Sequence, residues 1–141
     1  MPTAEETRAC AVAFAQALDN DDFALARALV DEACVYSVRG EVHHGPDAVV
    51  ESYAGAAEFV RGTFDAHRYE SAVDVTAPGR ARIDFADHLR HAGREHTFRS
   101  HQHIELGAAG RVVRITHEDL PGQREALDRW LTIVGVARRG E

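Results

Sequence analysis

Three side chains in this sequence combine the residue types and the spacing that general acid–base chemistry needs. His117 and Asp119 lie two residues apart on a segment of alternating polarity, so on a strand they would share one face, with Cα atoms roughly 6.5–7 Å apart. A carboxylate beside an imidazole can orient the ring and raise its basicity. Asp87 interrupts an apolar face, and a buried carboxylate must either find a partner or take up a proton. We therefore predict that Asp87, His117 and Asp119 are catalytic.

The same residues also allow a structural interpretation. His117 would then be a hydrogen-bonded core histidine, and Asp119 a solvated strand end. Asp87 would be held by Tyr69, Ser71 or a helix residue, or would reach solvent at the rim of the sheet.

The segments that must position these side chains alternate apolar and polar residues with a period of two: residues 81–90, 95–106 and 111–119. Antiparallel pairing through two short turns brings Asp87 opposite Phe98 and Ser100 opposite His117. One face of this meander then gathers apolar residues: Ile83, Phe85, Leu89, Phe98, Ile104, Leu106, Val113 and Ile115. An apolar face with polar residues at one end is what a small-molecule pocket needs.

An earlier alternating segment, residues 67–77, extends this face through a three-residue loop at residues 78–80. The pairing places Ser71 opposite Asp87, so that Asp87 and Asp119 lie in one row with backbones roughly 10 Å apart. Two carboxylates at this separation could flank one bound molecule. The polar side chains expected to contact a substrate are Tyr53, His67, Tyr69, Ser100 and Gln102.

Helical spacing of apolar residues occupies the rest of the chain. It predicts four helices: residues 3–18, Phe23 to Val30, Gly45 to Val60, and 123–134. Thr3 and Glu6 have capping-box spacing, and Pro46 suits an early helical position. A short strand at residues 34–38 precedes the third helix. Helices followed by a meander and a last helix indicate an α+β fold with an antiparallel sheet.

Length and charge narrow the classes of function. The 141 residues suit a single domain, 1–141, and the net charge of −7 argues against nucleic acid as a partner, because no basic stripe could neutralise phosphates. All basic residues are arginine, which excludes a lysine Schiff base. No apolar run has membrane length and no signal pattern occurs, so we expect a cytoplasmic protein without a membrane partner. Cys10 and Cys34 are expected to be buried free thiols.

The nine histidines raise the possibility of a metal site, which the predicted register disfavours. His101 and His103 form an H-x-H pair, but the predicted register places both on the outer face beside Arg82 and Arg114. Neighbouring guanidinium groups disfavour a bound cation. We therefore expect no metal and no other cofactor. The two histidines should instead pair with acidic residues, namely Asp84 and Glu105.

Over nearly its whole length the sequence resembles the nuclear-transport-factor-2-like superfamily, and within it the SnoaL-like group. The resemblance rests on the Ala-rich first helix followed by "ALDNDDFALARALV", on "YSVRGEVHHGPDAVVESY", and on the meander ending "RVVRITHEDLPGQREAL". It implies a cone-shaped α+β fold. In this fold a strongly curved antiparallel sheet packs against three N-terminal helices and a C-terminal helix, and leaves a deep apolar ligand-binding cavity.

The superfamily includes ketosteroid isomerase, scytalone dehydratase, limonene epoxide hydrolase and polyketide cyclases, beside proteins of no known reaction. In SnoaL-like cyclases an acidic residue near the end of the last long strand acts as base, and Asp119, or otherwise Glu118, is the matching position. The first-helix tyrosine of ketosteroid isomerase has no counterpart here, since that helix offers Phe14. Superfamily members often pair through the outer sheet face, which implies a homodimer.

The resulting hypothesis is a cofactor-independent enzyme that acts on small apolar metabolites by proton transfer, of the isomerase, cyclase or dehydratase type. Two alternatives remain open at this point. The same cavity could belong to a non-catalytic module that binds a small ligand, or side chains could fill it in an interaction protein. Because one fold hosts many functions, the resemblance does not decide whether the protein is an enzyme.

Overall fold

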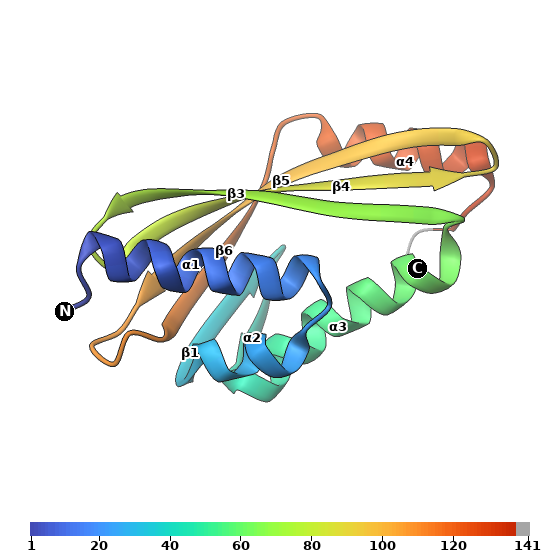
Figure 1. Ribbon diagram of the computed structural model, residues 1–141. Helices are drawn as coiled ribbons and strands as arrows, with labels where there is room; N and C mark the ends of the chain where they lie inside the picture. Colours follow the sequence, from blue (N-terminus) through green and yellow to red (C-terminus); the bar gives the residue numbers. More distant parts are fainter. Residues whose placement is uncertain (138–141) are drawn as a thin grey trace.

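The computed structural model describes residues 1–137, which contain four helices and one six-stranded sheet (Figure 1). The helices are α1 (Ala4–Asp19), α2 (Phe23–Leu29), α3 (Gly45–Thr63) and α4 (Gln123–Val134). The strands are β1 (Val30–Val38), β2 (Glu41–His44), β3 (Ala66–Ala77), β4 (Arg80–His91), β5 (Arg94–Leu106) and β6 (Val112–Asp119).

The strands follow the order β2-β1-β6-β5-β4-β3, and all neighbours are antiparallel except β1 and β6, which are parallel. The α+β class is confirmed, but the sheet is mixed and not purely antiparallel as predicted. β1 is longer than the predicted strand, and β2 was not predicted. In Figure 1 the curved sheet bends over α1, α2 and α3, which lie together on one side of it.

The central hairpin has the predicted register. Asp87 pairs with Phe98, and Phe85 pairs with Ser100 across β4 and β5. The turn between these strands contains Ala92 and Gly93, with φ of 51° and 74°, as a tight two-residue hairpin turn requires. Apolar side chains on the inner face of β4 and β5 therefore point toward the helices.

The predicted registers on either side of this hairpin are wrong by two residues, and a bulge in each pairing accounts for one residue of the shift. The turns account for the other: Ala77 pairs with Arg80, so the turn before β4 has two residues and not the predicted three. On one side Asp87 pairs with Tyr69, not with Ser71. On the other side Asp119 pairs with Ser100, and His117 pairs with Gln102. A shift of two residues keeps the side chains beyond each bulge on their predicted faces, but Asp87 and Asp119 no longer share a row.

The second bulge also changes which valine is buried. Val112 is fully buried opposite Leu106, whereas the predicted core residue Val113 is only partly buried. Two residues of β6 therefore exchange the faces that strict alternation would give them at this end of the strand.

The four predicted helices are present, with closely similar bounds. The Thr3 side chain accepts a hydrogen bond from the Glu6 backbone, and the Glu6 side chain accepts one from the Thr3 backbone, so the capping box is confirmed. Asp22 caps α2, and Pro46 occupies the first turn of α3. These signals fix where the chain enters each helix beneath the sheet.

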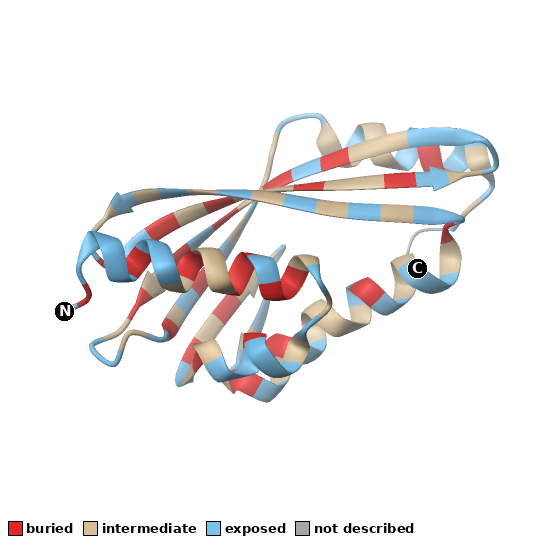
Figure 2. Ribbon diagram, viewed as in Figure 1, coloured by how far each residue is buried: buried red, intermediate tan, exposed pale blue. Residues whose placement is uncertain are grey.

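The main core lies between the sheet and the first three helices. Buried residues recur with helical spacing on α1 and with a period of two on the strands, which appears as alternating bands in Figure 2. Phe14, Ile83, Ile104 and Ile115 are among its fully buried side chains. A second, smaller cluster joins Phe64, Leu89, Trp130 and Leu131, and fastens α4 to the rest of the molecule.

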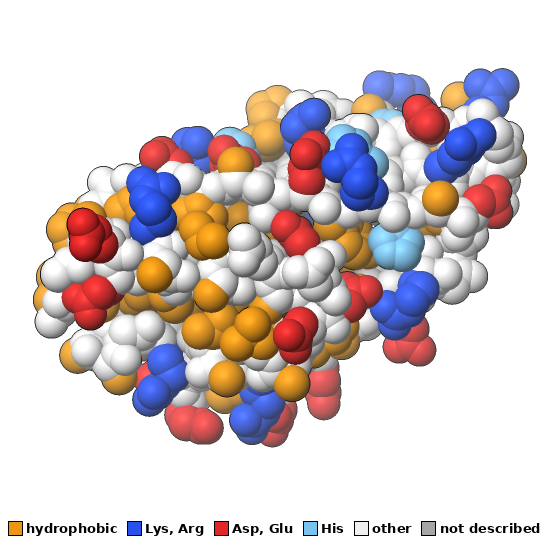
Figure 3. All heavy atoms as spheres, in the orientation of Figure 1, with side chains coloured by type: hydrophobic (Ala, Val, Ile, Leu, Met, Phe, Trp, Pro, Cys, Tyr) orange, Lys and Arg blue, Asp and Glu red, His pale blue; other side chains and the backbone are white. Residues whose placement is uncertain are grey.

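Cys34 is buried and Cys10 partly buried, and neither forms a disulfide. Among the described residues, no helix is long and apolar enough to cross a membrane. On the face drawn in Figure 3, acidic and basic side chains are interspersed and form no basic stripe.

Candidate active site

A cavity of about 600 Å³ lies between the inner face of the sheet and helices α1, α3 and α4. Its wall is largely apolar, and aromatic rings contribute much of it: Phe23, Phe59, Phe64, Phe85 and Phe98. Polar side chains line the cavity in two separate groups. One group comes from β1, β5, β6 and α3, and the other from the end of α1 and from β4.

The first group is a buried hydrogen-bond network centred on Gln102. The Tyr53 hydroxyl donates to Gln102 Oε1 at 2.5 Å, and Gln102 Nε2 donates to the Tyr36 hydroxyl at 3.0 Å. The rings of Tyr36 and Tyr53 are stacked, with centroids 5.0 Å apart. Because Gln102 holds both tyrosines, two phenol groups are fixed at the inner end of the cavity.

The network continues to His117 and determines which ring nitrogen of His117 carries the hydrogen. Gln102 Nε2 lies 3.2 Å from His117 Nδ1, and His117 Nε2 lies 2.8 Å from Asp119 Oδ1. Since the amide can only donate, Nδ1 accepts, and Nε2 carries the hydrogen that it donates to Asp119. Burial lowers the pKa of His117 and outweighs the opposing effect of Asp119, so the ring is neutral near pH 7.

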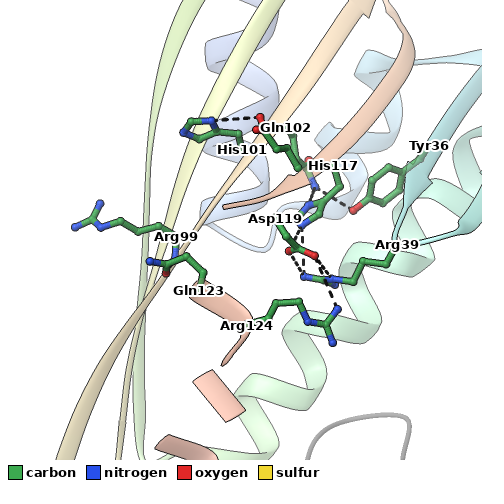
Figure 4. Close-up of polar contacts among 10 residues, drawn as sticks. Tyr36, Arg39, Arg99, His101, Gln102, His117, Asp119, Gln123 and Arg124 are labelled. Atoms are coloured by element: carbon green, nitrogen blue, oxygen red, sulfur yellow. Dashed lines mark hydrogen bonds and ion pairs between the residues drawn. The ribbon is translucent and has the colours of Figure 1, made fainter. Parts of the chain in front are cut away.

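Asp119 is held by two arginines that the sequence analysis did not single out (Figure 4). Arg39 binds it through both Nε and Nη2, at 2.7 and 2.8 Å, and Arg124 Nη1 lies 3.9 Å from Oδ2. Burial alone would raise the pKa of Asp119, but the hydrogen bonds from Arg39 and His117 outweigh it and lower the pKa to about 2. Asp119 is therefore a permanent anion and a weak base.

Arg39 reaches Asp119 from an unusual backbone position. It sits with Gly40 in the turn between β1 and β2, and both residues have positive φ, 45° and 82°. Non-glycine residues rarely adopt this conformation. The dipeptide could have indicated a tight turn in the sequence, but its contact with Asp119 depends on the parallel pairing of β1 with β6, which no local signal predicts.

Asp87 has the opposite environment. It faces the cavity from β4 and forms no hydrogen bond or ion pair within the described residues. Burial, followed by repulsion from Asp19, raises the pKa of Asp87 to about 6. A carboxyl group with this pKa can accept and return a proton near neutral pH.

Asp19 and Asp21 also line the cavity, beside Asp87 and at the end of α1. Asp19 Oδ2 accepts a hydrogen bond from the Ser71 hydroxyl at 2.6 Å, and burial raises its pKa. Asp21 Oδ2 binds Arg61 at 2.8 Å, while its Oδ1 is buried without a partner. The sequence suggested only that this acidic run ends one helix and caps the next.

The structure brings most of the predicted site residues to one cavity. Asp87, His117, Tyr53, Tyr69, Ser100 and Gln102 line it, and Asp119 lies directly behind His117. His67 does not line it and packs beside Tyr69, with ring centroids 5.1 Å apart.

The paired histidines lie on the outer face, as predicted, and bind carboxylates there. His101 lies 3.2 Å from Asp84, as expected, but His103 pairs with Glu118 at 2.8 Å and not with Glu105. Glu105 binds Arg80 and Arg114 instead. Within residues 1–137, no group of three or more His, Cys, Asp or Glu side chains has the arrangement of a metal site.

No family model matches the sequence, and no curated protein matches it significantly. Solved structures match it closely in shape. A protein of Xanthomonas campestris pv. campestris described as a "putative polyketide cyclase" superimposes with a TM-score of 0.67 at 15% identity, over 92% of this chain and 97% of that one. An LEH-like epoxide hydrolase of M. tuberculosis gives 0.64 at 19% identity, over 94% and 98%.

A de novo designed protein with a curved β-sheet also gives 0.64, at 15% identity and over 92% and 97% of the two chains. The chain has the nuclear-transport-factor-2-like fold. The resemblance noted in the sequence is therefore confirmed for the architecture. That a designed protein shares this nuclear-transport-factor-2-like shape illustrates why function must be argued from the site.

Proposed function

We propose that the protein is a cofactor-independent enzyme that transfers a proton on a small, mainly apolar substrate held in the cavity, with chemistry of the isomerase, cyclase or dehydratase type. The observation that carries the proposal is Asp87. Among the described residues this carboxylate has no hydrogen-bond or ion-pair partner; it lies on the wall of an apolar cavity, and its pKa is raised to about 6. General bases work best when their pKa lies near the operating pH.

In this proposal Asp87 removes a proton from a carbon next to a substrate carbonyl and returns it to another position. The carbonyl oxygen gains negative charge during that step and needs a hydrogen-bond donor. Tyr36 and Tyr53 both have pKa values raised above normal, mainly by burial, so both hydroxyls stay protonated. The Tyr53 proton is engaged with Gln102, which leaves Tyr36 as the proposed donor.

We propose that His117 and Asp119 orient other side chains and do not transfer the substrate proton. Because Nδ1 of His117 faces Gln102 and Nε2 faces Asp119, the ring holds the glutamine amide in one orientation. Gln102 in turn aims the two tyrosines. We therefore assign His117 and Asp119 to orienting and electrostatic support, with Ser100 and Tyr69 as further substrate contacts.

The printed descriptions of two similar structures, a "putative polyketide cyclase" and an epoxide hydrolase, are consistent with small-molecule chemistry on this fold. The proposal also includes one domain over residues 1–141, a cytoplasmic location, and a homodimer through the outer sheet face. The outer face supports pairing because carboxylates alternate there with His and Arg side chains.

Deuterium exchange into 2-tetralone tests the proposed chemistry directly, because it needs only proton abstraction next to a carbonyl. Proton NMR would follow loss of the α-proton signals in D₂O with and without protein. The wild-type protein should accelerate exchange, and Asp87→Asn should reduce the acceleration by about 10²–10⁴-fold. Asp84→Asn is the matched control, since Asp84 lies on the outer face of the same strand and binds Arg82.

Two results would contradict the proposal. Exchange by the Asp87→Asn variant at the wild-type rate would remove Asp87 from the chemistry. No acceleration by the wild-type protein, together with 2-tetralone binding measured by calorimetry, would favour the non-catalytic ligand-binding module.

A further inference from the structure

The surroundings of Asp87 resemble a binding site for a cation. Its neighbours on adjacent strands are Tyr69 of β3 and Phe98 of β5, and paired residues on antiparallel strands share a face. All three side chains line the cavity, as does Phe85, two residues along β4. A carboxylate between aromatic rings is an arrangement that binds ammonium groups, because the ring faces and the carboxylate both attract positive charge.

The end of α1 adds unsatisfied negative charge to the same part of the cavity. Asp19 contributes to the raised pKa of Asp87, and Asp21 and Asp87 both contribute, after burial, to the raised pKa of Tyr69. Arg61 neutralises one of these three carboxylates by binding Asp21. The other oxygen of Asp21 is buried without a partner, and Asp87 has none within the described residues. Because Asp87 lines the cavity, a ligand bound there can supply the hydrogen-bond donor that this carboxylate lacks.

We infer that the substrate carries a basic amine on its apolar body, and that Asp19 and one oxygen of Asp87 bind this ammonium group between Tyr69, Phe98 and Phe85, with the second oxygen of Asp87 left for proton transfer. The inference rests on the proposed function, whose substrate class it narrows. It also explains why one end of a largely apolar cavity gathers three carboxylates against a single arginine.

Two other ligand chemistries fit this end of the cavity less well. A substrate carboxylate would be repelled by Asp19, Asp21 and Asp87. A divalent metal ion would have to share the site with the Arg61 guanidinium, and the described residues contain no cluster with metal-site geometry. An ammonium group fits because it donates several hydrogen bonds and needs no fixed coordination number.

Three tetralin derivatives with the same ring system and different charge test the inference: 2-aminotetralin, 2-tetralol and tetralin-2-carboxylate. Isothermal titration calorimetry at pH 7.5 would measure their affinities for the wild-type protein. We expect the amine to bind at least about 10-fold more tightly than the alcohol, and the carboxylate to bind most weakly. At this pH the amine is protonated and Asp87, with a pKa of about 6, is ionised.

The variants assign the effect to the named residues. Asp87→Asn and Asp19→Asn should each weaken amine binding by about 10-fold or more and leave alcohol binding nearly unchanged. Asp84→Asn, on the outer face, should change neither affinity. Thermal unfolding of each variant checks that it is folded.

The outcomes separate this inference from the proposed function. Equal affinity for the amine and the alcohol overturns the ammonium site, while 2-tetralone exchange would still support Asp87 as a base. Amine binding that is unaffected in both variants also overturns it. If none of the three compounds binds and 2-tetralone is not exchanged, both proposals are wrong.

Discussion

Asp87 and Asp119 show how strongly the surroundings of one residue type decide its chemistry. Both were candidate bases in the sequence, and both are on the inner face of the sheet. Arg39 binds Asp119 through two nitrogens, which lowers the pKa of this carboxyl to about 2 despite its burial. Asp87 has no such partner, and its pKa is raised to about 6. The sequence located both carboxylates, but their roles depend on Arg39, which lies 80 residues from Asp119.

Titration of the carboxyl carbons by ¹³C NMR should resolve this difference. We expect a midpoint near pH 6 for Asp87, whereas Asp119 should remain ionised to about pH 2. Arg39→Leu should raise the pKa of Asp119 toward the model-peptide value of about 3.9 and leave that of Asp87 unchanged. Arg82→Leu, which removes an outer-face arginine, is the control and should affect neither. An unchanged Asp119 midpoint in Arg39→Leu would contradict the assigned cause.

The raised pKa of Asp87 also predicts how stability depends on pH. The folded state holds this proton up to about pH 6, whereas the unfolded chain releases it near pH 3.9. Ionising Asp87 therefore destabilises the protein as pH rises from about 4 to 6, and the penalty is constant above that range. Asp87→Asn removes this ionisation penalty. The difference in free energy of unfolding, variant minus wild type, should therefore be about 2 kcal/mol larger at pH 7.5 than at pH 4.

Urea unfolding at pH 4, 6 and 7.5 would measure this change. Asp84→Asn should give no comparable increase, because Asp84 is ion-paired with Arg82 on the outer face. A difference between Asp87→Asn and wild type that stays constant with pH would show that Asp87 titrates normally in the folded state.

At the scale of single elements, the bulge between β5 and β6 sets the position of His117 opposite Gln102. Gly107 lies at this point, and a Cβ atom built there would come within 2.8 Å of Val113 Cγ1. The alternating pattern correctly predicted that His117 and Asp119 of β6 point to the inner face. It cannot reveal an extra residue in one strand, because a bulge depends on contacts between strands, such as that of Gly107 with Val113.

Gly107→Ala should destabilise the protein by about 1–3 kcal/mol, because the added methyl group overlaps Val113. Val113→Ala removes the overlapping methyl groups, so the double variant should recover much of the loss. The measurement is a double-mutant cycle by urea unfolding. Purely additive effects of the two substitutions would mean that the contact with Val113 does not cause the loss of stability.

For the whole molecule, the signals that predicted the fold are local, whereas the one parallel pairing, between distant segments, was not predicted. Helix caps, the Ala92-Gly93 turn and period-two alternation each involve residues close in sequence, and the structure has them where expected. The parallel pairing of β1 with β6 joins segments far apart in the chain, so no turn chemistry specifies it. That pairing completes the mixed sheet and brings Arg39 to Asp119.

The outer face of the sheet leads to a prediction about the whole molecule, namely that it forms a homodimer through this face. Helices α1, α2 and α3 lie on the other side of the sheet, and the outer face bears both charge signs in alternation. Two copies related by a two-fold axis could bring the carboxylates of one face against the arginines and histidines of the other. Light scattering coupled to size-exclusion chromatography should therefore give the mass of a dimer for the wild-type protein.

Ala72→Glu should convert this dimer to a monomer, because Ala72 is exposed on the outer face of β3, opposite Asp84, where a longer acidic side chain would obstruct contact. Ala108→Glu adds the same charge in an exposed turn and should leave the dimer intact. A wild-type monomer, or a dimer that persists in Ala72→Glu, would mean that the outer face is not the interface. The cavity opens on the opposite side of the sheet, so loss of the dimer should leave binding of 2-tetralone unchanged.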